Sequence, residues 1–526
     1  METRKTKIIM TVGKASSSKK ALYELIKAGV DGIRLSTRFI RPEDKDLIMR
    51  NLREAEQEAK REVCVILSLR ESDIRIGSPD PQNPIVLKEG DIVKIVNDAS
   101  LVDDTNVAIC NNRELPNLVK RDDKLLLEFG KVVFTVLNVE LYKPRSLTPD
   151  PAADNQGSPI INENPEASND LKPINNFQRY QRVKPKIAKA PKVVICRAEN
   201  KCVINDQIPV NFSHTNIFDP DINNDMEDIR LLEWASSVDF DVIIYKQVRG
   251  EDDLESLWSI RIPPKTKRFA GIQTKESIGY LDNFIQLSDG AAIGRGILGV
   301  ETGLSEVCRL QKLIIKKCND KGKPVLLSTQ VLDSLVSRLK PSRSEVTDIT
   351  NMVFDGVDGI ILTGETAYGR NPLLAVQYLE SIISEAEQHI HYEEEQEMIF
   401  RDLKLPMSIT ENICYSAVRS VSSTMASLII CITKTGKTAQ KIVKYKPACM
   451  VLAITDCSKT LRFLRIVRGV YPVLMDQTAS HLVESALNIA KEHNLAQAGQ
   501  TVIYVCGGKD SFVEGDTSLL RFCTIP

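Results

Sequence analysis

Eight short segments rich in apolar and β-branched residues recur along the chain, and amphipathic segments separate most of them. The predicted strands are Lys7–Val12, Gly32–Ser36, Val63–Leu69, Asp241–Lys246, Phe269–Thr274, Gly290–Gly294, Val325–Thr329 and Gly359–Thr363. Alternating strands and helices favour a parallel sheet, and eight such units predict a closed (β/α)8 barrel. Functional side chains of that fold lie at the C-terminal ends of the strands, so we expect the site there.

One loop sequence occurs twice. The residues GVDGI stand at Gly29–Ile33 and again at Gly356–Ile360, in each case between a predicted helix and a predicted strand. Two β/α units that share a loop conformation are typical of a repeated barrel, although five residues also recur by chance.

The pattern changes after Gly77. Ile92–Val96, Lys124–Leu127 and Val132–Val139 alternate apolar and polar residues, which predicts a small all-β insertion between the third and fourth barrel strands. Residues 143–180 are rich in Pro, Asn, Asp and Ser, and predict a mobile loop. A basic run follows, which we interpret as a solvated face, with an anionic partner as the alternative; it comprises Arg179, Arg182, Lys184, Lys186, Lys189 and Lys192.

A further α/β domain is predicted after the barrel. Its expected strands are Leu428–Thr433, Cys449–Thr455, Tyr471–Leu474, Thr501–Cys506 and Leu520–Thr524, and their alternation with helices predicts a doubly wound sheet. The predicted domains are therefore a barrel at 1–77 and 207–395, an inserted β domain at 78–206, and a C-terminal α/β domain at 396–526.

Composition excludes several classes of function. The 526 residues include 70 acidic and 69 basic side chains, so no global field favours nucleic acid or an anionic membrane. Met1–Lys7 has no apolar core, and no apolar run approaches the roughly 20 residues that span a bilayer, so we expect a cytoplasmic protein. The twelve cysteines form no C-x-x-C pair, which favours buried thiols in a reducing compartment over disulfides or zinc.

Several motifs, in order along nearly the whole chain, resemble those of the pyruvate kinase family. They are Thr6–Gly13 (TKIIMTVG), Leu115–Gly130 in the insertion, Lys340–Glu345 (KPSRSE), Leu362–Ala367 (LTGETA) and Arg468–Leu474 (RGVYPVL). The resemblance implies phosphoryl transfer from phosphoenolpyruvate to ADP in glycolysis, with Mg²⁺ or Mn²⁺ and K⁺ as cofactors, and a homotetramer in the cytoplasm. Hard cations of this kind prefer oxygen ligands, carboxylates above all.

The resemblance also shows where this sequence departs from the family. At the fifth strand the family carries a lysine and a metal carboxylate, and here those positions are Gly271 and Gln273. The next lysine, Lys275, lies beyond the strand. At the sixth strand the second metal carboxylate is replaced by Ile297, whose hydrocarbon side chain cannot ligate a cation.

The other strand ends are partly retained. The family's transition-state arginine corresponds to Arg34, and its enolate-side threonine to Thr329. Its K⁺ positions are occupied by Ser36, Arg38, Ser68 and Leu69, and the D-D-G of its insertion reads Glu128-Phe129-Gly130. Expected substrate-binding positions are Arg75, Gly294, Arg295 and Gly296. The alternative is that the two glycines persist only for a turn, and that Arg34 and Thr329 are merely packed or solvated strand ends.

A hydroxyl-rich turn follows the first strand of the C-terminal domain. It comprises Thr433, Lys434, Thr435, Gly436, Lys437 and Thr438, and it resembles the T-x-S-G-R-S phosphate loop of family members regulated by fructose bisphosphate. Hydroxyls, backbone N–H groups and lysines at a strand-to-helix turn suit a dianion, so we expect a phosphate site; an ordinary helix cap is the alternative.

Three functions remain open from the sequence. The favoured interpretation is a member of the family with little or no activity, acting as a structural or regulatory subunit, alone or in a tetramer with an active paralogue. The second is an active enzyme in which Lys246 or Lys275 replaces the lost lysine. The third is a protein that binds a sugar phosphate, such as fructose 1,6-bisphosphate, through the C-terminal turn.

Overall fold

The computed structural model describes most of the chain. The described residues are 4–36, 38–40, 42–69, 74–80, 83–98, 102, 106–112, 115–127, 130–141, 192–204, 208–212, 233–235, 238–259, 262–403, 405–475, 482–507, 515 and 517–526. The chain divides into two compact units, of which one comprises residues 1–73 and 218–526 and the other residues 74–217. Each unit is described by itself.

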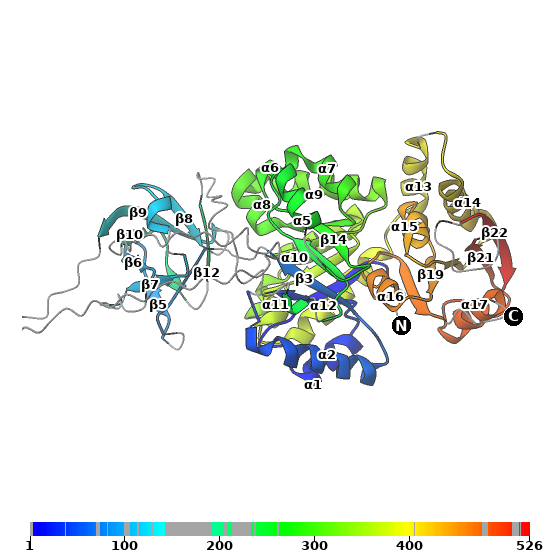
Figure 1. Ribbon diagram of the computed structural model, residues 1–526, viewed down its shortest axis with the longest axis horizontal. Coiled ribbons are helices and arrows are strands. Elements are labelled where there is room, and N and C mark those ends of the chain that lie inside the picture. Colours follow the sequence, from blue (N-terminus) through cyan, green and yellow to red (C-terminus); the bar gives the residue numbers. More distant parts are fainter. Residues whose placement is uncertain are drawn as a thin grey trace, which may run out of the picture. The chain divides into compact units, whose positions relative to one another are not determined.

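The first unit contains the predicted barrel, which is confirmed. Eight parallel strands close in the order β1-β17-β16-β15-β14-β13-β3-β2 (Figure 1). They are β1 (Lys7–Thr11), β2 (Gly32–Ser36), β3 (Cys64–Leu69), β13 (Val242–Tyr245), β14 (Lys267–Ile272), β15 (Gly290–Gly294), β16 (Val325–Ser328) and β17 (Gly359–Leu362). Nearly every strand residue is buried, as expected for parallel strands covered on both faces.

Helices cover the outside of this barrel (Figure 1). They are α1 (Lys19–Lys27), α2 (Lys45–Ala59), α5 (Glu251–Ser259), α6 (Lys275–Gly279), α7 (Leu281–Leu287), α8 (Arg295–Thr302), α9 (Leu304–Lys321), α10 (Arg343–Asp355), α11 (Gly364–Ala367) and α12 (Pro372–Glu387). Capping side chains and glycines mark the helix ends, and α10 is an example. For α10, Ser342 and Glu345 form a reciprocal capping box, and Gly356 ends the helix with a left-handed φ of 83°.

Four aspartates repeat one interaction at the N-terminal end of the barrel. They directly precede the second, fourth, sixth and eighth strands of the barrel in chain order, which are β2, β13, β15 and β17. Each carboxylate accepts a backbone N–H of the preceding strand, and the aspartate's own N–H donates to the carbonyl of that same residue. The pairs are Asp31 with Ile8 (2.8 Å), Asp241 with Val65 (2.9 Å), Asp289 with Arg268 (3.0 Å) and Asp358 with Val325 (2.9 Å). Asp31 and Asp358 belong to the two GVDGI copies, so that repeat marks a shared structural role.

Charges around these aspartates shift their pKa values in different directions. Burial alone would raise the pKa of Asp31, but Arg4, Lys7 and Arg61 outweigh it and hold the value below the ordinary range. Burial dominates at Asp358 and raises its pKa to about 6. The same cause raises the pKa of Asp241 to about 6, although Arg462 bonds to its carboxylate.

The second unit is a β barrel that also contains the short helix α3 (Leu115–Leu118), where the sequence predicts an all-β insertion. Its closed strand order is β10-β6-β7-β4-β12-β8-β9, and β5 (Ile85–Leu87) pairs separately with β11 (Cys202–Ile204). The barrel strands are β4 (Arg75–Gly77), β6 (Ile92–Val96), β7 (Val107–Cys110), β8 (Lys124–Leu127), β9 (Val132–Leu141), β10 (Lys192–Ala198) and β12 (Ile208–Phe212). The predicted mobile loop and the basic run, apart from Lys192, lie outside the described residues.

The C-terminal α/β domain belongs to the same compact unit as the (β/α)8 barrel. Its sheet has the order β20-β19-β18-β21-β22, with only β22 antiparallel. The strands are β18 (Leu428–Ile432), β19 (Met450–Thr455), β20 (Val470–Leu474), β21 (Thr501–Cys506) and β22 (Leu519–Thr524), and the helices from α13 onward are α13 (Tyr392–Arg401), α14 (Ile409–Thr424), α15 (Lys437–Lys444), α16 (Ser458–Leu464) and α17 (Leu482–Glu492).

Buried charge joins the C-terminal domain to the (β/α)8 barrel. Arg462 of α16 donates its Nε–H to both oxygens of Asp241, at 2.9 and 3.1 Å.

All twelve cysteines carry free thiols and most are buried. Among the described residues, no helix combines the length and apolar character needed to cross a membrane.

Candidate functional site

The position of the family's lysine is closed to any side chain. A Cβ built on Gly271 would lie 2.6 Å from Cα of Lys246 and 2.8 Å from the carbonyl oxygen of Tyr245. Both neighbours are backbone atoms at the end of β13, so they cannot turn aside as a flexible side chain can. The backbone at the end of β13 therefore lies so close to Gly271 of β14 that only glycine, which has no side chain, fits at this position.

Gln273 carries a buried polar group with no hydrogen-bond partner. The residue is 3% exposed, and its Oε1 has no such partner among the described residues. Its amide packs on Gly294, where an added Cβ would lie 2.4 Å from Nε2 of Gln273. Leaving a buried polar atom unpaired costs about 1–3 kcal/mol. This orphaned oxygen lies just after β14, where the family resemblance expects a metal carboxylate.

The turn after β15 is held by the protein itself. Arg295 is 9% exposed, bonds to Asp348 at 2.6 Å, and donates to the carbonyl oxygens of Thr329 and Gln330. The N–H of Gly296 donates to Oγ1 of Thr329 at 2.8 Å. Protein partners thus already satisfy two groups that the sequence assigns to substrate, while Ile297 lies half-buried on the same helix.

Backbone strain is concentrated at the end of β16. Thr329 has φ of 73° and Gln330 has φ of 55°. A β-branched residue rarely adopts the left-handed region, and such strain clusters at functional sites. Hydrogen bonds hold Thr329 in this conformation: its Oγ1 accepts the Gly296 N–H, and its carbonyl oxygen accepts from Arg295.

Polar side chains of β2 and β3 face one another. Ser36 and Ser68 are in register, and Nε of Arg34 donates to Oγ of Ser68 at 2.9 Å. The backbone N–H of Arg38 donates to Oγ of Ser36, and its guanidinium lies 5.2 Å from the Phe39 ring. The hydroxyls at the K⁺ positions therefore have protein donors.

The remaining predicted residues of the barrel site belong to different parts of the chain. Leu69 is buried at the end of β3. Arg75 belongs to the other compact unit, where its N–H donates to Asn111. Glu128 and Phe129 of the insertion motif lie outside the described residues.

Neither candidate replacement lysine has the place of the lost one. Lys246 is half-buried after β13, and its own backbone closes the space over Gly271. Lys275 is exposed at the start of α6, and its N–H donates to Glu301 at 2.9 Å. The two lysines that the sequence offers as replacements follow β13 and β14, but neither stands at position 271.

An ion-pair cluster that the sequence motifs do not single out lies beside these strand ends. Arg249 bonds to Glu276 at 3.0 Å and to Glu301 at 3.3 Å. Burial raises the pKa of Glu301, although the Lys275 N–H and Arg249 oppose the shift. Glu301 lies four residues after Ile297 on α8, so helical spacing could have placed it on the same face.

The carboxylates that the structure describes do not form a metal site. Within the described ranges, no group of three or more His, Cys, Asp or Glu side chains is placed to hold a metal ion. Glu365 of the LTGETA motif is buried, and its oxygens accept the N–H groups of Leu332 (2.9 Å) and Thr363 (2.6 Å). Burial raises its pKa, against these two hydrogen bonds. The residues present thus do not fit a divalent cation held by two carboxylates.

The C-terminal turn folds onto itself. Oγ1 of Thr433 accepts the N–H of Gly436 at 3.0 Å, and Gly436 has φ of 83° at the start of α15. Thr438 shares a hydrogen bond with Thr517 at 2.9 Å. Lys434 and Lys437 are exposed and Thr435 is half-buried. The structure thus places both lysines at the surface of one strand-to-helix turn.

This architecture, an eight-stranded barrel with a separate β unit and a C-terminal α/β domain, defines the class of protein. The family model of the pyruvate kinase barrel domain matches residues 3–156 and 182–376, and that of its alpha/beta domain matches residues 411–522. The chain belongs to the pyruvate kinase family, which binds phosphoenolpyruvate and ADP and generally uses Mg²⁺ and K⁺.

Individual relatives match along most of their length. The chain is 30% identical to a pyruvate kinase of Eimeria tenella, over 99% of this chain and 89% of that protein. It is 29% identical to a cytosolic isozyme of Nicotiana tabacum, over 95% and 93%. The solved structure of Cryptosporidium parvum pyruvate kinase in complex with ADP aligns with a TM-score of 0.81 and 27% identity, over 99% of this chain and 96% of that one.

Proposed function

We propose that this member of the pyruvate kinase family transfers phosphoryl groups slowly or not at all. The main support is the close approach at Gly271, where backbone atoms occupy the space of the side chain that would neutralise the transferring phosphoryl group. Gln273 and Ile297 supply no charge for a metal. Phosphoryl transfer depends on positioning and charge compensation, so these three changes remove what the reaction most needs.

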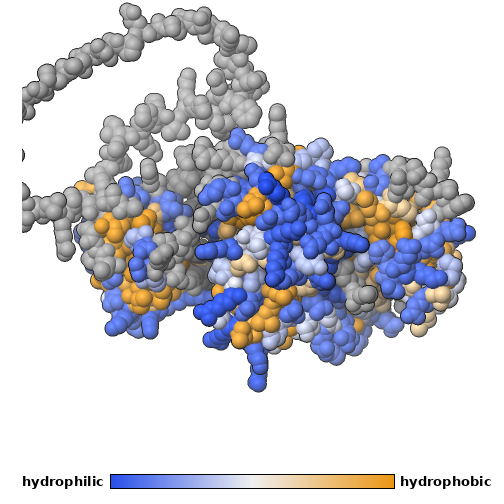
Figure 2. All heavy atoms as spheres, turned by 90° about the horizontal axis from the view of Figure 1, so that it is seen from below, coloured by the Kyte–Doolittle hydropathy of each residue, from blue (hydrophilic) through white to orange (hydrophobic). Residues whose placement is uncertain are grey.

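The corresponding role is that of a structural or regulatory subunit in the cytoplasm. Two features support assembly with other subunits, either identical copies or an active paralogue. Strand β22 is an edge of its sheet, with Phe522 half exposed. Large apolar side chains lie on the surface, including Leu304, Leu405 and Met425, and Figure 2 shows hydrophobic patches on a largely hydrophilic face.

The test is a coupled assay for pyruvate formation on purified protein, with Mg²⁺ and K⁺ titrated separately. Losing one positioned charge typically costs about 10²–10³ in rate. We therefore expect activity near the detection limit and no dependence on either cation. A catalytically active relative, purified in parallel, is the control. Turnover in the usual range, roughly 1–10³ s⁻¹, would overturn the proposal.

The rival proposal is an active enzyme that uses a different lysine. Lys246 supports it, because this residue directly follows β13 and its backbone lies beside Gly271; Lys275 is the other candidate. Should turnover be found, Lys246→Ala and Lys275→Ala identify the replacement. Loss of turnover in one variant and not the other would assign the role.

A second candidate function is binding of a phosphorylated effector at the C-terminal turn. Its support is the pair of exposed lysines beside the hydroxyls of Thr433 and Thr438. This function is independent of the barrel site and compatible with a non-catalytic subunit. Fructose 1,6-bisphosphate is the first ligand to test.

A further inference from the structure

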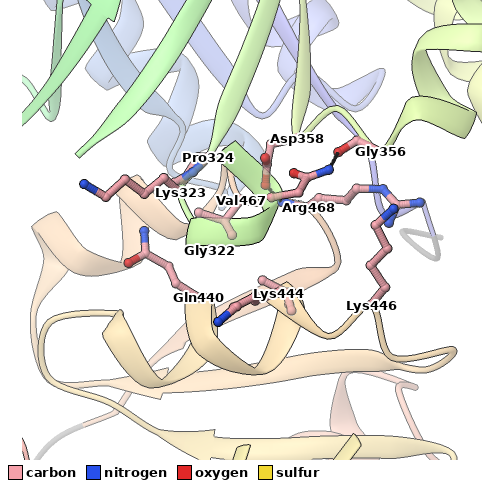
Figure 3. A pocket seen from close by; sticks show the side chains of 12 residues that line it. Gly322, Lys323, Pro324, Gly356, Asp358, Gln440, Lys444, Lys446, Val467 and Arg468 are labelled. Atoms are coloured by element: carbon pink, nitrogen blue, oxygen red, sulfur yellow. Dashed lines mark hydrogen bonds between the residues drawn. The ribbon is translucent and has the colours of Figure 1, made fainter. Parts of the chain in front are cut away.

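Lysines at the junction between the (β/α)8 barrel and the C-terminal domain differ in their partners. Figure 3 shows one part of this junction, a cavity of about 30 Å³ with Lys323 on the barrel side and Lys444 and Lys446 on the α15 side. Lys323 donates to three main-chain carbonyl oxygens. Lys444 pairs with Glu411 at 2.6 Å, and the ammonium of Lys446 lies 3.0 Å from Glu395. These ammonium groups are therefore already satisfied by the protein.

Elsewhere at the junction, a lysine meets a thiol. Nζ of Lys265, in the turn before β14, donates to Sγ of Cys457, which directly precedes α16, at 3.3 Å. The two residues are 192 positions apart in the sequence, so their contact joins the barrel to the C-terminal domain. Among the described residues, no carboxylate lies within ion-pair distance of Lys265. The sulfur is thus the group that this ammonium faces.

Neighbouring contacts hold the two side chains together. Lys459 of α16 donates to the carbonyl oxygen of Pro264, which precedes Lys265, at 3.3 Å. The backbone N–H of Cys457 donates to Oγ1 of Thr455 at 3.3 Å. The turn and the start of α16 are thus fastened beside the pair, and groups that are already positioned react faster than groups that must first meet.

The surroundings of Cys457 favour its thiolate, which is the reactive form of the side chain. Burial alone would raise the pKa of this thiol, but hydrogen bonding by Thr460 and the charge of Lys265 outweigh it and hold the pKa below the ordinary value. By contrast, burial raises the pKa of core thiols such as Cys318 and Cys431. Cys457 is partly exposed and Lys265 is exposed, so a small solute reaches the pair.

We propose that Cys457 and Lys265 form a redox-sensitive pair, which hydrogen peroxide joins by a covalent sulfur–nitrogen bond. The thiolate attacks one peroxide oxygen: an S–O bond forms, the O–O bond breaks, and the departing hydroxide takes a proton from the Lys265 ammonium. The neutral amine then attacks the sulfur of the sulfenic acid. An S–N bond forms, and the sulfenic hydroxyl leaves as water with a proton from the amine. Sulfur loses two electrons, the peroxide oxygens gain them, and two water molecules are released.

The bond would fasten the barrel to the C-terminal domain. A cross-link between residues so distant in sequence restricts the unfolded chain, and it should therefore stabilise the folded protein. Small thiols would reverse it, because they attack oxidised sulfur. The pair shares no residue with the barrel site or the C-terminal turn, so the inference does not rest on the proposed function.

Mass spectrometry of the full-length protein after hydrogen peroxide treatment tests the proposal. Remaining thiols are alkylated before digestion. We expect a peptide in which Cys457 is bonded to Lys265, and its loss after treatment with dithiothreitol. Cys308→Ser is the matched control, because Cys308 is an exposed thiol on α9, and this variant should keep the bond.

Lys265→Arg separates the two steps. Arginine keeps the positive charge but does not lose its proton, so Cys457 should stop at the sulfenic acid, which dimedone traps, and no cross-link should form. Peroxide should raise the melting temperature of the wild type and not that of this variant.

Three results would overturn the proposal. They are a Cys457 that stays reduced while Cys308 is oxidised, a Cys457 sulfenic acid that accumulates in the wild type without any bond to Lys265, and an equal rise in melting temperature in the Lys265→Arg variant. The first two are measured on the wild type, so they decide the proposal even where a variant fails to fold.

Discussion

A side chain at position 271 should lower the free energy of unfolding, because backbone atoms already lie close to Gly271. Gly271→Ala adds a methyl group 2.6 Å from a backbone carbon, and overpacking of this kind costs about 1–3 kcal/mol. We expect a lower melting temperature for this variant. Gly250→Ala is the matched control, because nothing lies within 4 Å of its added Cβ. Equal melting temperatures for the two variants would show that β13 moves aside easily.

Sequence reasoning identified which residues stand at the strand ends, but not how they are placed. Gly271 and Ile297 follow from matching motifs in order. The approach of Lys246 to Gly271 depends on the backbone path after β13, where Gln247 adopts φ of 53°, and no residue type signals that path. The orphaned oxygen of Gln273 likewise depends on neighbours distant in sequence.

Asp358 should contribute a pH-dependent stability with an unusual sign. Its folded-state pKa of about 6 lies above the ordinary value near 4. Between these values the folded protein holds a proton that the unfolded chain has lost, so this group's stabilisation is present at low pH and is lost as pH rises through 6. A shift of this size corresponds to roughly 3 kcal/mol.

Asp358→Asn isolates that contribution. The variant loses an acceptor and should be less stable overall, so the informative quantity is the change in melting temperature between pH 5 and pH 7. We expect the wild type to gain more than the variant when the pH falls. Identical pH profiles would show that Asp358 keeps an ordinary pKa.

At the scale of elements, the C-terminal turn is the feature most open to test. Fructose 1,6-bisphosphate at millimolar concentration should raise the melting temperature of the wild type and not that of a Lys437→Ala, Thr438→Ala double variant. The rise should be modest, because lysine lacks the bidentate geometry of arginine. A rise of equal size in both proteins, or none in the wild type, would exclude the turn as the site.

The elements themselves were largely predictable. All eight barrel strands lie within about two residues of their predicted bounds, because buried parallel strands give continuous apolar runs. The sequence also signalled the GVDGI repeat, but not its purpose. Only the structure relates Asp31 and Asp358 to Asp241 and Asp289, whose flanking residues differ. Domain boundaries and site roles stay predictions.

For the whole molecule, assembly is the property that would give an inactive subunit a role. We expect the protein to co-purify with an active pyruvate kinase of the same organism when both are expressed together, and to change its maximal rate or its response to effectors. Size-exclusion chromatography with light scattering, followed by assay of the mixed species, measures both. The control is the active enzyme alone at the same concentration.

Two results would separate the forms of that proposal. A stable tetramer of this chain alone, which never mixes with the active enzyme, would favour a homotetramer with an independent role. A monomer under all conditions would exclude a subunit function of either kind.

The contact between Gly271 and Lys246 also bears on evolutionary history. A lysine at this position would require the end of β13 to withdraw, because an added Cβ would lie 2.6 Å from a backbone carbon of Lys246. Carboxylates regained at positions 273 and 297 would bring no benefit before that withdrawal. Under the proposed function, sterics thus set the order of changes that would lead to catalysis, with the backbone after β13 moving before any new charged side chain is useful.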